Sequence, residues 1–180
     1  MSGPHDGQPV LQAGEPLATA RAAMILVHGR GASAADIMTL GAELMHPGVA
    51  YLAPQAAGNV WYPNPFTAPM ESNEPYLSSA LEVLVSLLAS IEKSVPADRV
   101  ILLGFSKGAC LTLEFAARHA RRFGGLAGLR WGLIGPGGPP MHLTATGTET
   151  RRALVLILHD SAQPPTTPEH DWVPKGLCRS

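Results

Sequence analysis

The pentapeptide Gly104-Phe105-Ser106-Lys107-Gly108 is the part of the sequence whose residue types and spacing point most directly to chemistry. It follows an apolar run at 99–103 and precedes an amphipathic stretch at 109–118. A Gly-x-Ser-x-Gly pattern on a strand-to-helix turn is typical of a nucleophile elbow, in which a strained serine projects its hydroxyl away from the backbone. We therefore predict that Ser106 is a catalytic nucleophile. The competing interpretation is a glycine-rich turn whose serine only caps the next helix.

A second short motif, His28-Gly29-Arg30-Gly31, follows the apolar run at 22–27. Acyl transfer requires hydrogen-bond donors for the negative charge that develops on the carbonyl oxygen. The backbone N–H of Lys107, directly after the serine, is one such donor. The loop at 28–31 can supply the other, as it does in α/β-hydrolases. His28 itself is predicted to orient this loop.

Apolar runs alternate with helical patterns along the chain. The sequence predicts strands over 22–27, 48–53, 99–103, 125–129 and 153–158, and helices over 34–45, 74–94 and 107–119. This alternation favours an α/β fold with a mainly parallel sheet and helices on both faces, whose site lies beyond the carboxyl ends of the strands. Residues 1–20 are predicted to be a loose lead-in with at most one short edge strand, and 55–73 a long loop.

The pattern at 74–94 is the clearest helix. Leucine and isoleucine recur at steps of four and three and predict one buried stripe, made of Leu77, Leu81, Leu84, Leu88 and Ile91. Polar residues fall elsewhere around this helix: Ser79, Glu82, Ser86 and Lys93. For the helix at 34–45, we predict Ser33 as the N-cap, with Asp36 favouring the positive end of the helix.

The overall composition indicates one globular domain over residues 1–180. A net charge of −1 gives no basic field for nucleic acid or an anionic membrane. No apolar run approaches the ~20 residues that span a bilayer, and no secretion signal is recognised, so a cytoplasmic location is expected. The histidines and acids show no metal-ligand spacing, so no metal is expected. Four histidines are predicted to lie at the surface: His5, His46, His119 and His142.

Seven blocks extend the two motifs along the chain, at 25–32, 52–56, 59–63, 73–75, 77–81, 103–110 and 132–136. Together they resemble the phospholipase/carboxylesterase family of α/β-hydrolases, small serine esterases that include acyl-protein thioesterases. The resemblance covers roughly residues 20 to 138. It implies the α/β-hydrolase fold and a serine hydrolase without a cofactor, acting on small-molecule carboxylic esters: short acyl esters, lysophospholipids or thioesters. The natural substrate and a homodimer are left open.

The resemblance also implies roles for individual residues. Ser106 corresponds to the nucleophile, and the backbone amides of Arg30 and Lys107 correspond to the oxyanion hole. Trp61 and Tyr62 match a segment near the substrate cleft of relatives, so we expect them to bind substrate. Lysine stands at position 107 where the family commonly has glutamine. Because the donor there is a backbone amide, the oxyanion hole is expected to survive this change.

The sequence departs from the family pattern after residue 138. Relatives carry an aspartate in a motif resembling Asp-x-Asp-Pro and, later, a histidine in a Gly-His pair. Here Asp160 is the candidate acid, with Gln163 as the other occupant of that place, and His170 rather than His159 is the candidate base, in the chain order Ser…Asp…His. The last strand and helix of the fold are expected to be missing, and 163–180 is predicted to be an irregular tail. A truncation or a changed reading frame after about residue 140 would explain this loss.

Two other functions agree with parts of the sequence. The segment at 29–34 fits the Gly-x-Gly-x-x-Ala dinucleotide fingerprint, but Ala53-Pro54-Gln55 stands where a ribose-binding acid should close the next strand. The second alternative is a catalytically impaired α/β-hydrolase that lacks a working Asp/His pair. Such a protein would retain only the slow chemistry that an oxyanion hole and binding provide.

Overall fold

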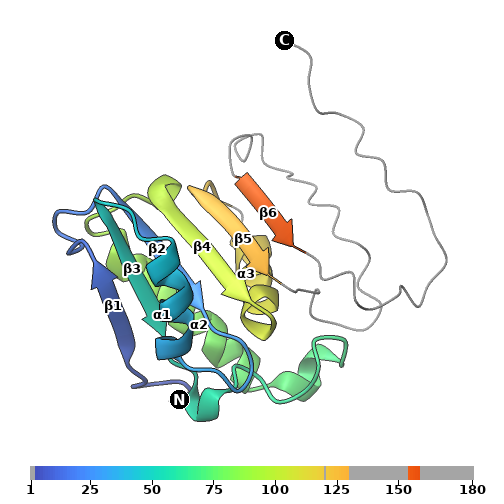
Figure 1. The fold of residues 1–180 in the computed structure, drawn as a ribbon. Helices are drawn as coiled ribbons and strands as arrows, with labels where there is room; N and C mark the ends of the chain where they lie inside the picture. The colour runs from blue at the N-terminus through green and yellow to red at the C-terminus, as the bar shows by residue number, and fades with distance from the viewer. Residues whose placement is uncertain (1–2, 120, 130–153, 159–180) are drawn as a thin grey trace.

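In the computed structural model, residues 3–119, 121–129 and 154–158 are described. Within these ranges a six-stranded sheet carries helices on both faces (Figure 1). The strands are β1 (Val10–Gly14), β2 (Ala22–Val27), β3 (Val49–Pro54), β4 (Val100–Phe105), β5 (Gly125–Leu129) and β6 (Leu154–Leu158). The α-helices are α1 (Ala34–Glu43), α2 (Tyr76–Ile91) and α3 (Lys107–Arg118), with 3₁₀ turns η1 (Ala57–Asn59), η2 (Met70–Asn73) and η3 (Ala97–Arg99).

The sheet has the strand order β1-β3-β2-β4-β5-β6. Strands β2 to β6 run parallel, and β1 pairs antiparallel with β3 at one edge. This arrangement confirms the predicted α/β-hydrolase fold with a mainly parallel sheet. The expected loss of the last strand and helix, and the irregular tail at 163–180, concern residues outside the described ranges.

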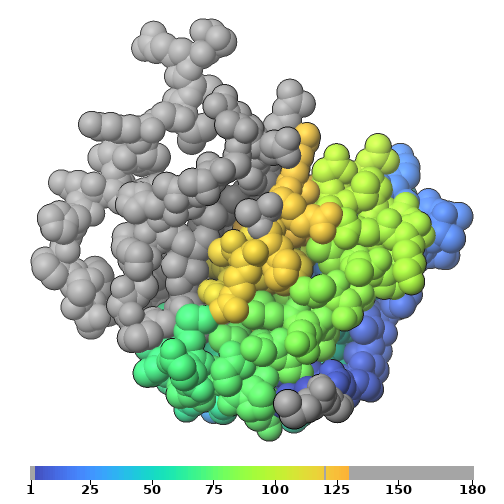
Figure 2. Space-filling model, turned by 180° about the vertical axis from the view of Figure 1, so that it is seen from behind, coloured from blue at the N-terminus to red at the C-terminus, as the bar shows by residue number. Residues whose placement is uncertain are grey.

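The central strand β2 shows how the sheet separates two layers, since successive side chains of a strand point to opposite faces. Ala23 and Ile25 pack in the cluster that contains the buried residues of α2 and α3. Met24 and Leu26 pack in the other cluster, with α1. Figure 1 shows α1 on the near face of the sheet and α2 and α3 on the far face, which Figure 2 views from behind. The continuous apolar run of β2 is therefore explained by burial on both faces.

Helix α2 confirms the predicted stripe, because the five leucine and isoleucine residues named for it are all buried. Ser79 was expected on the polar side of this helix, and that expectation is wrong. The Ser79 side chain is buried, and its Oγ accepts a hydrogen bond from the backbone N–H of His5 at 3.0 Å. The N-terminal segment covers this part of α2. At α1, Ser33 and Asp36 form the predicted cap, as a reciprocal capping box.

Within the described residues, the N-terminal segment contains one short strand, β1. His5 attaches this segment to the loop after β3. His5 was predicted at the surface, but its side chain is buried. Its Nδ1 accepts a hydrogen bond from the Ala57 N–H at 3.1 Å, and its Nε2 donates to the Trp61 carbonyl at 2.9 Å. These bonds require the neutral imidazole with its proton on Nε2. The partners lie more than 50 residues later in the chain, so no local pattern indicated them.

Candidate active site

Ser106 lies on the sharp turn between the end of β4 and the start of α3. Its backbone has φ 52° and ψ −117°, a conformation that residues with a side chain rarely adopt. The Ser106 N–H donates to the Leu129 carbonyl at 2.7 Å, and the Ser106 carbonyl accepts from the Ala109 N–H at 2.9 Å. These bonds hold the turn in place. A strained serine between a parallel strand and a helix is the geometry of a nucleophile elbow.

The glycines on either side of Ser106 are required by space. A Cβ atom at Gly104 would lie 2.4 Å from the Gly108 carbonyl oxygen, and one at Gly108 would lie 2.3 Å from the Val27 carbonyl oxygen. Both distances are far below van der Waals contact. Strand β4, helix α3 and the end of β2 therefore approach one another too closely for any side chain at these positions.

The Ser106 side chain is half-buried, and within the described part of the chain it makes no hydrogen bond that caps α3. The structure therefore does not support the interpretation of Ser106 as a helix cap. Among the same residues, neither the backbone N–H of Lys107 nor that of Arg30 donates a hydrogen bond. Both amides can therefore donate to an oxygen atom that binds beside the serine.

The loop after β2 lies directly against the elbow. A Cβ atom at Gly29 would stand 3.4 Å from the Ser106 Cβ and 3.1 Å from the Phe105 ring. Arg30, the next residue, is close enough for its guanidinium to lower the pKa of Lys107. The structure thus brings together Ser106 and the two residues predicted to form the oxyanion hole.

His28 orients this loop, as the sequence predicted. Its buried imidazole donates from Nδ1 to the Gly29 carbonyl at 2.8 Å and accepts at Nε2 from the Ala56 N–H at 3.1 Å. The Trp61 indole donates from Nε1 to the His28 carbonyl at 2.9 Å, and the two ring centroids are 4.9 Å apart. The loops that follow β2 and β3 are therefore bonded to each other beside Ser106.

Trp61 and Tyr62, the predicted substrate-binding residues, are both 0% exposed. Besides His28, the Trp61 ring contacts the His5 ring, with centroids 5.5 Å apart. In this structure the two aromatic side chains hold the loop after β3 in place. Their contact with substrate stays a prediction.

The side chain of Lys107 turns into the protein, which the sequence did not predict. Its Nζ donates to the Tyr62 carbonyl at 2.7 Å and to the Pro63 carbonyl at 3.5 Å, and lies 4.4 Å from the centroid of the Tyr62 ring. Lys107 is only 8% exposed, which is rare for a lysine. Burial, and then the positive charge of Arg30, lower the pKa of Lys107 to about 8.

The sequence profile of one family matches most of the chain. The phospholipase/carboxylesterase profile aligns with residues 10–161. The chain belongs to the phospholipase/carboxylesterase family. The match starts before and ends after the span of 20–138 on which the resemblance was based, and it includes β6.

Three solved structures share the fold of this chain. A phospholipase/carboxylesterase from Dyadobacter fermentans DSM 18053 is 43% identical, with a TM-score of 0.69 over 72% of this chain and 62% of that one. Esterase PE8 is 22% identical, with a TM-score of 0.56 over 71% and 64% of the two chains. Zea mays acyl-protein thioesterase 2 is 14% identical, with a TM-score of 0.57 over 93% of both chains. The chain thus spans less than two thirds of the Dyadobacter protein. The search of curated proteins gives no match.

In this member of the phospholipase/carboxylesterase family, the start of α1 is not a phosphate site. Gln55 Oε1 accepts from the Ala34 N–H at 2.9 Å, and Ser33 Oγ accepts from the Asp36 N–H at 3.2 Å. The Asp36 carboxylate also places a negative charge at this helix end. A dinucleotide phosphate needs free N–H groups and a positive field there, so the structure does not support the dinucleotide interpretation.

Three residues named as catalytic candidates, Asp160, His170 and His159, lie outside the described residues, as does Gln163.

In the ranges that the structure describes, no group of three or more His, Cys, Asp or Glu residues could hold a metal ion. None of the helices described here has the length and apolar character needed to cross a membrane.

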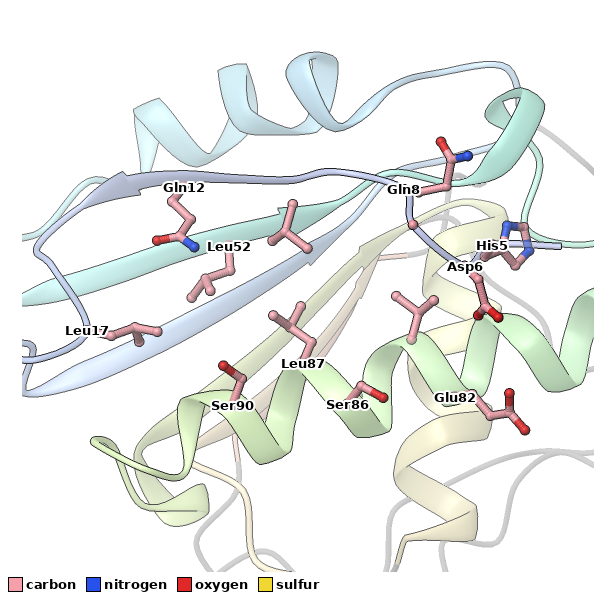
Figure 3. Close-up of a pocket in the computed structure, with 13 residues that line it drawn as sticks. His5, Asp6, Gln8, Gln12, Leu17, Leu52, Glu82, Ser86, Leu87 and Ser90 are labelled. Atoms are coloured by element: carbon pink, nitrogen blue, oxygen red, sulfur yellow. The ribbon is translucent and has the colours of Figure 1, made fainter. Parts of the chain in front are cut away.

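A pocket of about 490 Å³ lies elsewhere on the molecule, between the N-terminal segment, β1 and α2 (Figure 3). Leucines 17, 52 and 87 line its interior together with polar residues that include Gln8 and Gln12. No residue of the elbow or of the loop at 28–31 lines it. This pocket is therefore separate from the candidate active site.

Proposed function

We propose that the protein is a serine hydrolase that cleaves carboxylic esters through an acyl-enzyme on Ser106. The backbone of Ser106 is the observation that supports this most strongly, because φ 52° at a serine between two sterically required glycines is costly. The strain has a chemical use, since it directs the hydroxyl away from its own backbone. Membership of the phospholipase/carboxylesterase family supports the same reaction.

The reaction would follow from the positions of three groups. Ser106 Oγ attacks the ester carbonyl carbon while a base takes the hydroxyl proton, and the carbonyl oxygen becomes negative. The amides of Arg30 and Lys107 would stabilise that oxyanion. Collapse of the tetrahedral intermediate expels the alcohol, which receives the proton, and water then hydrolyses the acyl-serine by the same steps. This sequence requires no cofactor.

The general base would come from outside the described residues, because all four described histidines are committed elsewhere. His5 and His28 use both ring nitrogens in backbone hydrogen bonds. His46 precedes β3 and therefore lies at the N-terminal ends of the parallel strands, whereas Ser106 lies at their C-terminal ends. Its side chain donates to the Pro47 carbonyl. His119 follows the C-terminus of α3, a helix about 18 Å long that begins at the elbow. Three histidines remain: His142, His159 and His170.

Replacement of the serine tests the nucleophile. We expect Ser106→Ala to lower kcat for p-nitrophenyl acetate by roughly 10³-fold or more, because no other group can form the acyl-enzyme. It should also abolish labelling by a fluorophosphonate probe. Ser86→Ala, at an exposed position on α2, is the matched control and should behave like the wild type. Equal turnover by Ser106→Ala and wild type would reject the mechanism.

Replacement of the remaining histidines tests the base. In keeping with the chain order Ser…Asp…His, we propose Asp160 and His170 as the acid and base. His170→Ala should therefore reduce kcat nearly as much as Ser106→Ala, whereas His142→Ala should leave it unchanged. Full activity in His170→Ala would remove His170 from the site, and a selective loss in His159→Ala would assign the base to His159. Wild-type turnover as low as that of Ser106→Ala would favour the catalytically impaired alternative.

The substrate class follows from the same reaction. We propose a small-molecule carboxylic ester, with thioesters and lysophospholipids as the other acyl donors to compare. The Dyadobacter protein is a phospholipase/carboxylesterase, and the maize protein is an acyl-protein thioesterase. The ratio of kcat/KM for matched acetyl and butyryl esters and thioesters measures the preference directly.

A further inference from the structure

The Lys107 ammonium joins the first turn of α3 to the loop after β3. It donates to two consecutive carbonyls, of Tyr62 and Pro63, and lies over the Tyr62 ring. We propose that this ammonium is a positioning group, which fixes the oxyanion amide of the elbow relative to the loop that carries Arg30. The inference rests on the proposed function of Ser106 and adds a dependence on the charge of Lys107.

A closed path of contacts supports this role. Lys107 holds the backbone of Tyr62, and the adjacent Trp61 indole holds the His28 carbonyl at 2.9 Å. The residue after His28, Gly29, packs against Ser106, which precedes Lys107. Of the two proposed oxyanion donors, Lys107 lies on this path, and Arg30 directly follows Gly29, which also lies on it. Weakening the Lys107 bonds would therefore let the two amides move relative to each other, which costs transition-state stabilisation more than substrate binding.

The charge of Lys107 does not serve stability. Its pKa is lowered to about 8, chiefly by burial and then by Arg30, with Cys110 acting in the opposite direction. The Tyr62 phenol beside it stays protonated, because burial raises its pKa. Between pH 8 and the ordinary lysine value of about 10.4, the unfolded chain holds a proton that the folded protein releases. The free energy of unfolding therefore rises with pH over this window, and the buried ammonium is unfavourable for folding below it.

Activity should follow the opposite trend. A neutral amine loses the attraction to the Tyr62 ring and the charge-assisted bonds to the two carbonyls. Above about pH 8 the path around Ser106 would loosen while the fold becomes more stable. A lysine with only a structural role would make kcat and stability change in the same direction.

Three variants separate these roles. Lys107→Met keeps the length and apolar stem of the side chain but removes every donor. Lys107→Gln keeps neutral donors and does not titrate. If Lys107→Met does not fold, Lys107→Gln replaces it in the experiment. Lys93→Met makes the same change at an exposed site on the turn after α2 and is the matched control. Turnover of p-nitrophenyl acetate is measured from pH 6 to 10 after subtraction of the buffer rate, with urea unfolding at each pH.

We expect Lys107→Met to lose about 10- to 100-fold in kcat with little change in KM, and to be at least as stable as the wild type at pH 7. The wild type should lose kcat with a midpoint near pH 8, a limb that both Lys107 variants lack. Lys107→Gln should retain an intermediate kcat. Hydrogen exchange of the amides at 57–62 should be faster in Lys107→Met than in Lys93→Met, independent of activity.

Two results would overturn the inference. One is wild-type kcat and pH dependence in Lys107→Met, or in Lys107→Gln if only that variant folds. The other is a parallel fall of kcat and stability in these variants, which would assign Lys107 a structural role. Failure of the proposed function gives a different pattern, in which Ser106→Ala and wild type have equal turnover while the exchange of 57–62 still reports on the Lys107 contacts.

Discussion

Gly108 has no room for one more carbon atom, because a Cβ there would meet the Val27 and His28 carbonyl oxygens at 2.3 and 2.4 Å. Both atoms belong to the backbone of the central strand and its loop, so they cannot turn aside as a flexible side chain could. We therefore expect Gly108→Ala to destabilise the protein by about 1–3 kcal/mol and to displace Ser106 enough to abolish esterase activity. Urea unfolding and p-nitrophenyl acetate turnover measure the two effects.

Gly128 on β5 offers the matched control for this substitution. A Cβ there would make ordinary contacts of 3.6 Å with Ala109 and Leu113. Gly128→Ala should therefore be neutral, or stabilising by up to about 1 kcal/mol through the lower entropy of the unfolded chain. If Gly108→Ala unfolds at the same urea concentration as Gly128→Ala and turns over substrate, the steric account of the elbow is wrong.

At the scale of elements, local patterns in the sequence were enough to predict strands β2 to β6 and the three α-helices near their observed positions. Strand β1 was expected only as at most one short edge strand within residues 1–20. Periodicity of two or 3.6 residues decides which side chains of a strand or helix can share a face, and the five stripe residues of α2 obey it. Ser79 does not follow this periodicity, because the N-terminal segment around His5 covers it. Burial that comes from another element leaves no periodic signal in the helix itself.

The candidate site likewise contains features that the sequence predicts and one that it does not. Ser106 and its glycines could be predicted because a tight strand-to-helix turn restricts three positions in five consecutive residues. The inward turn of Lys107 could not, since its partners are backbone carbonyls of Tyr62 and Pro63, about 45 residues earlier in the chain. Carbonyl oxygens exist at every residue, so sequence gives no sign of which ones a lysine will reach.

At the scale of the whole molecule, three distant segments meet at Trp61. Its ring contacts both His5, from the N-terminal segment, and His28, from the loop after β2. Each imidazole donates to one backbone carbonyl and accepts from one backbone N–H. Protonation would turn the accepting nitrogen into a donor that faces another donor. Burial is the main cause that lowers the pKa of both histidines.

This arrangement predicts loss of stability in mild acid. Because both folded-state pKa values lie below the ordinary value of about 6.5, the unfolded chain binds more protons than the folded protein just below that pH. The free energy of unfolding should therefore be fully present above pH 6.5 and should fall as the pH decreases from there, by at most about 1.4 kcal/mol per pH unit for each histidine. The Asp36 carboxyl, whose pKa is lowered by Ser33, loses its contribution only below about pH 4, so the two effects are separate.

Urea unfolding of single variants between pH 7.5 and 5 measures this loss. His28→Gln cannot titrate but can still donate and accept, so its stability should fall less steeply with decreasing pH than that of the wild type, although it starts from a lower value. His46→Gln removes an exposed histidine and should keep the wild-type slope. Histidines outside the described residues contribute equally to both variants and cancel from the comparison. A slope for His28→Gln equal to that for His46→Gln would show that the neutral imidazole of His28 does not hold the loops around Trp61.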